Sequence, residues 1–218
     1  MADRDLLDEQ IAYYRARAAE YDATSPPPDG DPFAPSANAV REALRRFAPR
    51  GRVIEIAAGT GQWTGLLADV AGDLLVTDSS PEMLDLNRAK TGERPNVAYT
   101  IADALAFAPT HDRDVAFFGF FLSHVPPTQF EAFWGVLAGV LAPGGRVFFA
   151  DEGRHFLWRE DWIDEDAGIV RRPLTDGTAF RAVKVLWRAD ELDARLRSLG
   201  WHASVTEETP FYWGTAYR

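Results

Sequence analysis

A short turn of small residues, 57–61, directly follows the apolar run 53–56. Small residues let the backbone approach a bound molecule closely, and glycine also adopts backbone angles that other residues reach only at a cost. A second apolar run, 74–77, ends in Asp78, whose carboxylate can accept hydrogen bonds from both hydroxyls of a ribose. In open α/β sheets, ligands bind at the carboxyl ends of the strands. The turn and Asp78 therefore predict a site for a nucleoside-type cofactor.

The details of the turn separate two kinds of nucleotide site. A dinucleotide-binding turn has the pattern Gly-x-Gly-x-x-Gly, but Thr64 stands at the third glycine position here. The segment instead resembles the first motif of the class I S-adenosylmethionine (SAM)-dependent methyltransferases, an acidic residue followed by small residues and Gly-Thr-Gly. Ala57 stands where that family often has glycine. The matching residues are Glu55, Gly59, Thr60 and Gly61.

Four further segments follow in the order of that family. The stretch 79–84 begins a helix after the ribose acid, and the resemblance places Met83 against the adenine. The run 97–104 contains Asp103, which in the family's position accepts a hydrogen bond from the adenine amino group. The segments 115–127 and 141–151 resemble the fourth strand with its loop and the fifth strand with its preceding turn.

The resemblance implies that the cofactor is SAM and that S-adenosylhomocysteine (SAH) is its product. It also implies a set of cofactor-binding residues, which lie at the strand ends and in the N-terminal segment. These residues are Tyr14, Arg17, Tyr21, Glu55, Ala57, Gly59, Thr60, Gly61, Trp63, Asp78, Ser79, Met83, Asp103, Ala104 and Phe120.

The segment 13–22 resembles the Tyr-Tyr-x-x-Arg-Ala-x-x-Tyr-Asp opening of many small-molecule methyltransferases, which folds over the cofactor. Helical spacing puts Tyr14, Arg17 and Tyr21 on one face. Arg17 is expected to meet the methionine carboxylate or a substrate anion, while the tyrosines exclude water. The alternative is that the two tyrosines are core residues and Arg17 is a solvated charge.

The segment 167–188 carries a local net charge of +4, whereas the whole chain has a formal net charge of −10. This contrast predicts an anionic substrate. Residues 180–187 alternate like a strand, so Arg181 and Lys184 would project to opposite faces. Lys184 and Arg171 are the chosen anion-binding residues. The alternative is that these cations pair with the acidic residues of 160–166.

His124 follows the fourth apolar run and is the expected catalytic residue. Its unperturbed pKa lies near neutrality, so it can act as a general base for a neutral hydroxyl acceptor. It can equally donate a hydrogen bond to an anion, or have only a local structural role. The predicted substrate-binding residues are Tyr14, Arg17, His124, Arg171 and Lys184.

Taken together, these residues predict a SAM-dependent O-methyltransferase of a small anionic metabolite. The chain looks most like a phosphonate O-methyltransferase of the dehydrophos type, from bacterial secondary metabolism; a carboxylate or phosphate would satisfy the same cations. Two alternatives remain, a C- or N-methyltransferase and a non-catalytic SAM-binding protein.

Composition restricts other functions. The net charge of −10 argues against a nucleic-acid substrate, which calls for a basic face. The chain has no cysteine and only four histidines, so no metal site is expected. No apolar run is long enough to span a membrane and no signal segment is recognised, so a cytoplasmic location is expected. The oligomeric state is not predicted.

Strands and helices alternate along the chain, which is typical of a doubly covered parallel sheet. Helices are predicted at 5–22, 36–47, 62–70, 81–90, 127–141 and 189–199, and a proline-rich turn at 25–32. The family resemblance implies a Rossmann-like, seven-stranded and mostly parallel sheet, with an antiparallel last strand at 211–217. One domain, 1–218, is expected, with an N-terminal lid at 1–35 and an insertion after the fifth strand at 152–188.

Overall fold

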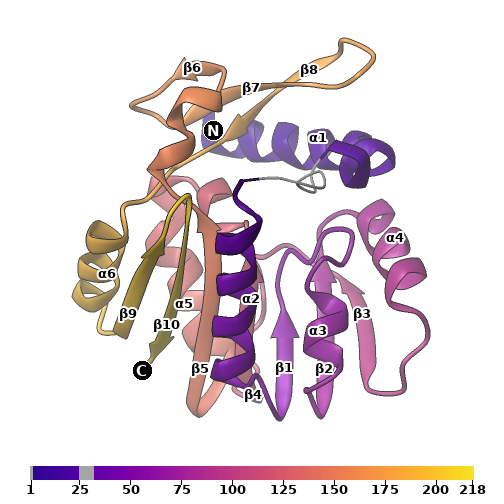
Figure 1. The fold of residues 1–218 in the computed structure, drawn as a ribbon, viewed down its shortest axis with the longest axis vertical. Coiled ribbons are helices and arrows are strands. Elements are labelled where there is room, and N and C mark those ends of the chain that lie inside the picture. Colours follow the sequence, from indigo (N-terminus) through magenta and orange to yellow (C-terminus); the bar gives the residue numbers. More distant parts are fainter. Residues whose placement is uncertain (1, 25–31) are drawn as a thin grey trace.

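A seven-stranded sheet forms the centre of the computed structural model, which describes residues 2–24 and 32–218 (Figure 1). The strand order is β3-β2-β1-β4-β5-β10-β9, and β10 runs antiparallel to both of its neighbours. This arrangement confirms the predicted class I methyltransferase fold, including its reversed last strand. The strands are β1 (Arg52–Glu55), β2 (Asp73–Asp78), β3 (Val97–Ile101), β4 (Arg113–Gly119), β5 (Leu141–Glu152), β9 (His202–Glu208) and β10 (Phe211–Tyr217).

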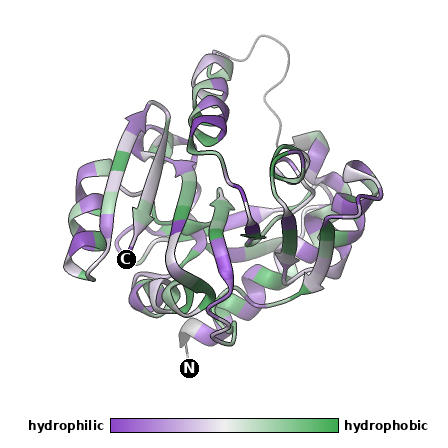
Figure 2. Cartoon of the chain, turned by 90° about the horizontal axis from the view of Figure 1, so that it is seen from below, coloured by the Kyte–Doolittle hydropathy of each residue, from purple (hydrophilic) through white to green (hydrophobic). Residues whose placement is uncertain are grey.

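Helices cover both faces of the sheet because the strands bury apolar side chains on both sides. In β1, Val53 packs with the helices on one face, and the next residue, Ile54, packs with those on the other. In Figure 2 much of the hydrophobic colour lies on the central strands. The first face is covered by α2 (Ala34–Phe47), α3 (Thr64–Ala68) and α4 (Pro81–Thr91), and the second by α5 (Phe130–Val140) and α6 (Ala189–Ser198).

Local sequence signals explain where some of these helices begin. Ser80 caps α4 by accepting a hydrogen bond from Met83 N at 3.1 Å, and Pro81 occupies the first turn, where its missing N–H costs nothing. The predicted helix at 62–70 is shorter because residues 59–63 form turns before α3. The predicted helix at 127–141 starts as a short 3-10 turn (Pro127–Gln129) before α5.

The N-terminal helix α1 (Ala2–Thr24) lies across the carboxyl ends of the strands (Figure 1). It extends beyond the predicted 5–22 at both ends. The predicted proline-rich turn falls on residues 25–32, of which 25–31 lie outside the described part of the chain. Within the described ranges, none of the helices has the length and apolar character needed to cross a membrane.

The predicted insertion forms a 3-10 helix, Arg154–Arg159, and a small antiparallel sheet of β6 (Trp162–Asp164), β7 (Ile169–Pro173) and β8 (Ala179–Val183). This sheet lies on the far side of α1 from the large sheet (Figure 1). The strand predicted at 180–187 ends at Val183, because the next two backbone N–H groups leave the small sheet. Lys184 N donates to Gly168 O and Val185 N donates to Ser123 O, both at 2.7 Å.

Candidate functional site

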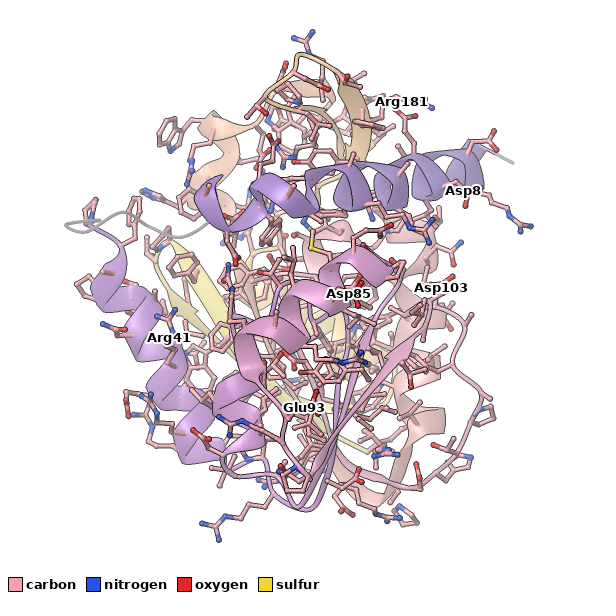
Figure 3. All side chains as sticks on the ribbon, turned by 90° about the vertical axis from the view of Figure 1, so that its right-hand side faces the viewer. Asp8, Arg41, Asp85, Glu93, Asp103 and Arg181 are labelled. Atoms are coloured by element: carbon pink, nitrogen blue, oxygen red, sulfur yellow. The ribbon has the colours of Figure 1, made fainter. Side chains whose placement is uncertain are left out.

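Two adjoining cavities lie against α1. The first, of about 320 Å³, lies at the carboxyl ends of β1, β2 and β4, and the second, of about 530 Å³, reaches from there to the insertion and the start of α2. Figure 3 shows α1 crossing above Asp103 and below Arg181. The two cavities share the wall residues Tyr14, Tyr21, Gln62, Trp63, Phe120 and His124.

The turn after β1 is tied to the acid after β2. Gly59 N donates to Asp78 Oδ2 at 2.8 Å, and Ser80 N donates to Asp78 Oδ1 at 2.9 Å. Burial raises the pKa of Asp78, while these backbone N–H groups oppose the shift. A Cβ at Gly59 would meet nothing within 4 Å. The turn therefore leaves open space where a ligand can approach the backbone.

Gly61, two residues later, serves a different purpose. A Cβ there would lie 2.8 Å from Asn87 Cγ, so the glycine admits the Asn87 side chain from α4. Asn87 Nδ2 donates to Gly59 O at 3.2 Å and to Thr64 Oγ1 at 2.9 Å. Asn87 thus fixes the turn, a role that the sequence analysis missed because the α4 pattern does not show what its inward face meets.

Glu55 does not line either cavity. It is buried at the end of β1, and among the described residues neither carboxylate oxygen has a partner in good hydrogen-bond geometry, although the nearby Thr64 hydroxyl opposes the rise of its pKa. Burial raises its pKa to about 8, so the side chain is mostly protonated at neutral pH. The structure therefore places Glu55 beneath the turn instead of against a ligand.

The structure brings most of the predicted cofactor-binding residues to the first cavity. Asp103 lies there, and its Oδ1 accepts a hydrogen bond from Leu105 N at 2.9 Å. Arg17 lines the second cavity instead, and Gly61 packs against Asn87. The predicted residues that line the first cavity are Tyr14, Tyr21, Ala57, Gly59, Thr60, Trp63, Asp78, Ser79, Met83, Asp103, Ala104 and Phe120.

The first turns of α1 contribute wall residues that the sequence analysis did not select. Leu7 and Ile11 line the first cavity together with Tyr14. Their spacing of four and three residues places them on one helix face. This apolar stripe is a sequence signal that could have identified both residues.

His124 is held in one protonation state by its partners. Its Nδ1 lies 2.8 Å from Val183 O, and since a carbonyl only accepts, Nδ1 carries the proton. Its Nε2 lies 2.9 Å from Tyr14 Oη. Burial, together with Lys184 and Arg172, lowers the pKa of His124 well below its usual value, and burial raises that of Tyr14. The neutral imidazole therefore accepts a hydrogen bond at Nε2 from the Tyr14 hydroxyl, which keeps its proton.

Lys184 is the cation most deeply buried in the second cavity. Its Nζ lies 2.6 Å from Glu152 Oε2 and donates to Ser123 Oγ at 3.2 Å. Burial opposes the charge, but Glu152 and the nearby Asp151 raise the pKa of Lys184 overall. Lys184 thus reaches the predicted substrate side as a charged group.

Arg171 does not reach the cavity, whereas its neighbour Arg172 does. Adjacent residues of a strand point to opposite faces. Arg171 is 60% exposed and pairs with Asp161, and Arg172 lines the second cavity and lies 2.6 Å from Glu160 Oε2. The pairing with residues of 160–166 that was the alternative in the sequence analysis is present for both arginines.

Charge is unevenly distributed in the second cavity. Its described wall has two acids, Glu152 and Glu160, and more cations than acids. The cations are Arg17, Arg41, Arg159, Arg172 and Lys184. In a chain with a net charge of −10, this is a local excess of positive charge that can attract an anion.

The first cavity fits SAM. The backbone at Gly59 is open to a ligand. Asp78 and Asp103, at successive strand ends, supply carboxylates suited to the ribose hydroxyls and to the adenine amino group, and the buried Met83 supplies an apolar surface suited to the adenine ring. Among residues 2–24 and 32–218, no cluster of three or more potential metal ligands is present.

Comparisons with known proteins agree with this fit. A family model described as a methyltransferase domain matches residues 53–145. The chain is 39% identical to a solved DhpI-SAM-HEP complex, covering 98% of both chains with a TM-score of 0.83. It is also 39% identical to a solved DhpI-SAH complex, covering 97% of this chain and 96% of the other with a TM-score of 0.82.

A curated relative gives a more distant match. The chain is 27% identical over 106 residues to phosphoethanolamine N-methyltransferase 1 from Arabidopsis thaliana. This match covers 47% of the chain and 22% of the relative, so the chain spans about a fifth of that protein's length.

Proposed function

Since the chain belongs to the class I SAM-dependent methyltransferases, we propose that it transfers the methyl group of SAM to an oxygen of a small anionic metabolite, with a phosphonate as the favoured acceptor. The observation that carries this proposal is the excess of cations in the second cavity, directly beside the first. Arginine and lysine match the oxygens of a phosphonate, phosphate or carboxylate.

The proposal assigns the first cavity to SAM. Asp78 would bind the ribose hydroxyls, and Asp103 the adenine amino group, with Met83 against the adenine ring. Arg17 is assigned to the acceptor side, because it lines the second cavity.

When bound, SAM supplies an electrophilic methyl group, and transfer needs alignment of donor and acceptor together with exclusion of water. An acceptor oxygen that is already ionised needs no general base. The neutral His124 accepts a hydrogen bond from Tyr14, so its role would be to orient the Tyr14 side chain beside the acceptor. Lys184 and Arg172 would neutralise the anion and hold it at the junction of the two cavities.

The preference for a phosphonate in bacterial natural-product biosynthesis is supported by similarity. The DhpI-SAM-HEP complex shares 39% of its residues with this chain and aligns over nearly the full length. The resemblance to phosphonate O-methyltransferases of the dehydrophos type points the same way.

A second candidate is N-methylation of a small molecule that carries a phosphate. The similarity to phosphoethanolamine N-methyltransferase 1 favours it, because a phosphate group would use the same cations. The match covers 47% of this chain, so it is a weaker basis than the full-length similarity.

Turnover measurements with acceptors of matched size test the proposal. We expect SAH release and a methyl ester with ethylphosphonate, weaker turnover with ethyl phosphate and propionate, and none with phenol. Tandem mass spectrometry of the product from phosphoethanolamine distinguishes N- from O-methylation. A preference for phenol over every anionic acceptor would contradict the proposal.

A further inference from the structure

We infer that the acceptor carries an apolar arm, aromatic or branched, beside its anionic group. This inference rests on the proposed function and adds a second recognition element to it. The second cavity is lined by cations and by aromatic rings, and two of the cations, Arg41 and Arg159, lie over the rings of Trp63 and Phe156.

The aromatic rings form a continuous series of contacts. Trp63 stacks with Phe120 at a centroid distance of 6.2 Å, and Phe120 contacts Phe211 at 5.7 Å. Phe211 contacts Phe156 at 5.9 Å, and Phe156 contacts Phe33 at 5.4 Å. We call these five rings the aromatic wall.

The aromatic wall comes from segments far apart in the sequence. Its rings stand at the start of α2, before α3, after β4, in the 3-10 helix after β5 and at the start of β10, and all five line the second cavity. Trp63 and Phe120 also line the first cavity, so the wall begins at the junction. An acceptor oxygen placed there would have its carbon skeleton directed along the wall.

Charged and polar groups fix the other end of the acceptor. Lys184, Arg172 and His124 line the same cavity away from the wall rings, whereas Arg41 and Arg159 lie over two of those rings, Trp63 and Phe156. The ion pairs and hydrogen bonds of Lys184, Arg172 and His124 involve the insertion, β5 and α1 instead. An acceptor with only an anionic group would leave the aromatic wall facing water.

Exposure and volume argue that the wall is more than packing. Phe33, Phe120 and Phe211 are half-buried, whereas Trp63 and Phe156 are buried, so the three half-buried residues supply the accessible part of the wall. Covering such surface with an apolar group is favourable by roughly 25 cal/mol per Å². The cavity of about 530 Å³ is within the size range of sites that enclose larger ligands than a two-carbon acid.

A homologous series of phosphonates tests the inference. Ethyl-, butyl- and 2-phenylethylphosphonate share the anionic group and differ in the arm. We expect kcat/KM to rise about ten- to a hundredfold from ethyl to 2-phenylethyl, since burial of a phenyl group has that effect on affinity. The association constants of the same compounds for the SAH-loaded protein, measured by calorimetry, should rise by a similar factor.

Two phenylalanines at the ends of α2 provide a variant and its control. Phe33 belongs to the aromatic wall, whereas Phe47 is also half-buried but packs on Phe148, outside both cavities. Phe33→Ala should reduce the ratio of phenylethyl to ethyl affinity at least threefold, and Phe47→Ala should keep it. Phe33→Leu, which retains volume, should recover part of the ratio, and melting curves establish that each variant is folded.

The outcomes separate the two proposals. Equal affinity and turnover for ethyl- and 2-phenylethylphosphonate would overturn the apolar arm and leave phosphonate methylation standing. Tighter binding of the phenylethyl compound without methylation of any phosphonate would support the arm and overturn the proposed reaction. A ratio that falls equally in Phe33→Ala and Phe47→Ala would also overturn the role of the aromatic wall.

Discussion

A single histidine shows how burial decides between two chemical roles. His124 has the pKa of a general base in water, but its burial and the neighbouring cations favour the neutral form. Both ring nitrogens are engaged, Nδ1 by Val183 O and Nε2 by the Tyr14 hydroxyl. Because the Tyr14 hydroxyl occupies the one free lone pair of the ring, His124 cannot take a proton from the acceptor unless Tyr14 moves. His124 is therefore better suited to orienting the Tyr14 side chain than to proton abstraction.

His124→Asn distinguishes these roles. An orienting role predicts a loss in kcat/KM of about ten- to thirtyfold, with a pH profile of kcat that keeps its shape in the variant. A general base would contribute about 10² to 10⁴, and its acidic limb would lie below pH 6.5 because burial lowers the pKa of His124. Initial rates with ethylphosphonate from pH 5.5 to 9 measure both quantities, and a limb that disappears in the variant would contradict the orienting role.

Glu55 gives a prediction about stability. Its pKa is about 8 in the folded protein and near 4.5 in an unfolded chain. Between these values the folded state binds more protons than the unfolded state, so this residue lowers stability as the pH rises from 4.5 to 8. Glu55→Gln does not titrate, and its Tm should exceed that of the parent protein by a margin that widens by about 5 °C or more from pH 6 to pH 9.

Thermal melts of both proteins at each pH measure this margin. A margin that stays constant from pH 6 to pH 9 would mean that Glu55 is ionised in the folded state throughout. The Kd of the same variant for SAH tests the sequence prediction that Glu55 binds the cofactor.

At the scale of elements, the turn between β1 and α3 separates two glycines with different roles. Gly59 and Gly61 both have positive φ, at 54° and 87°, so a Cβ strains either position. Only Gly61 faces a close neighbour, the Asn87 side chain. Gly61→Ala should therefore destabilise the fold by roughly 1–3 kcal/mol more than Gly59→Ala does, and it should have the lower Tm.

The Kd for SAH should respond in the opposite order. A methyl group at Gly59 projects into the open space beside the first cavity. Gly59→Ala should therefore raise the Kd for SAH about tenfold or more, although it lowers Tm less than Gly61→Ala does. Isothermal calorimetry and melting curves on the two variants provide this comparison. The same ranking of the two variants in both measurements would contradict the distinct roles.

The pair Arg171 and Arg172 tests the alternation of β7. Arg172 lines the second cavity, and Arg171 is exposed on the opposite face. Arg172→Ala should raise the KM for ethylphosphonate about tenfold or more, whereas Arg171→Ala should change it less than twofold. The Arg171–Asp161 pair is exposed and the Arg172–Glu160 pair is largely buried, so Arg172→Ala has the larger folding cost, and melting curves establish that both variants are folded. Equal effects on KM would contradict the assignment.

The sequence predicted the succession of strands and helices but not which face of β7 meets the second cavity. The succession of strands and helices along the chain, the position of Asp78 and Asp103 in the wall of the first cavity and the reversed last strand follow from local patterns and from the family resemblance. Which face of β7 meets the cavity depends on how the small sheet docks on α1, through contacts such as Val183 N to Gln10 Oε1 at 2.9 Å. No local pattern encodes that docking, so Arg171 was chosen where Arg172 lies in the wall.

At the scale of the whole molecule, a net charge of −10 surrounds a cavity with an excess of positive charge. The negative charge is spread over the surface, where salt screens it and where it repels an anion only weakly. The cations of the second cavity act at short range on a bound acceptor. The attraction between these cations and the anionic acceptor therefore decides the affinity for the acceptor, although the net charge of the protein is negative.

Ionic strength provides the test of this balance. Raising NaCl from 0.05 to 0.5 M shortens the Debye length from more than 10 Å to about 4 Å, and added chloride competes for the same cations. We expect the KM for ethylphosphonate to rise about three- to tenfold, because chloride competes for the cations of the second cavity, whereas screening acts mainly on surface charge that repels the acceptor only weakly. SAH carries no net charge at neutral pH, so its Kd should change less than twofold and serves as the internal control. A KM that falls with salt would mean that the surface charge of the whole molecule, rather than the cations of the second cavity, governs access of the acceptor.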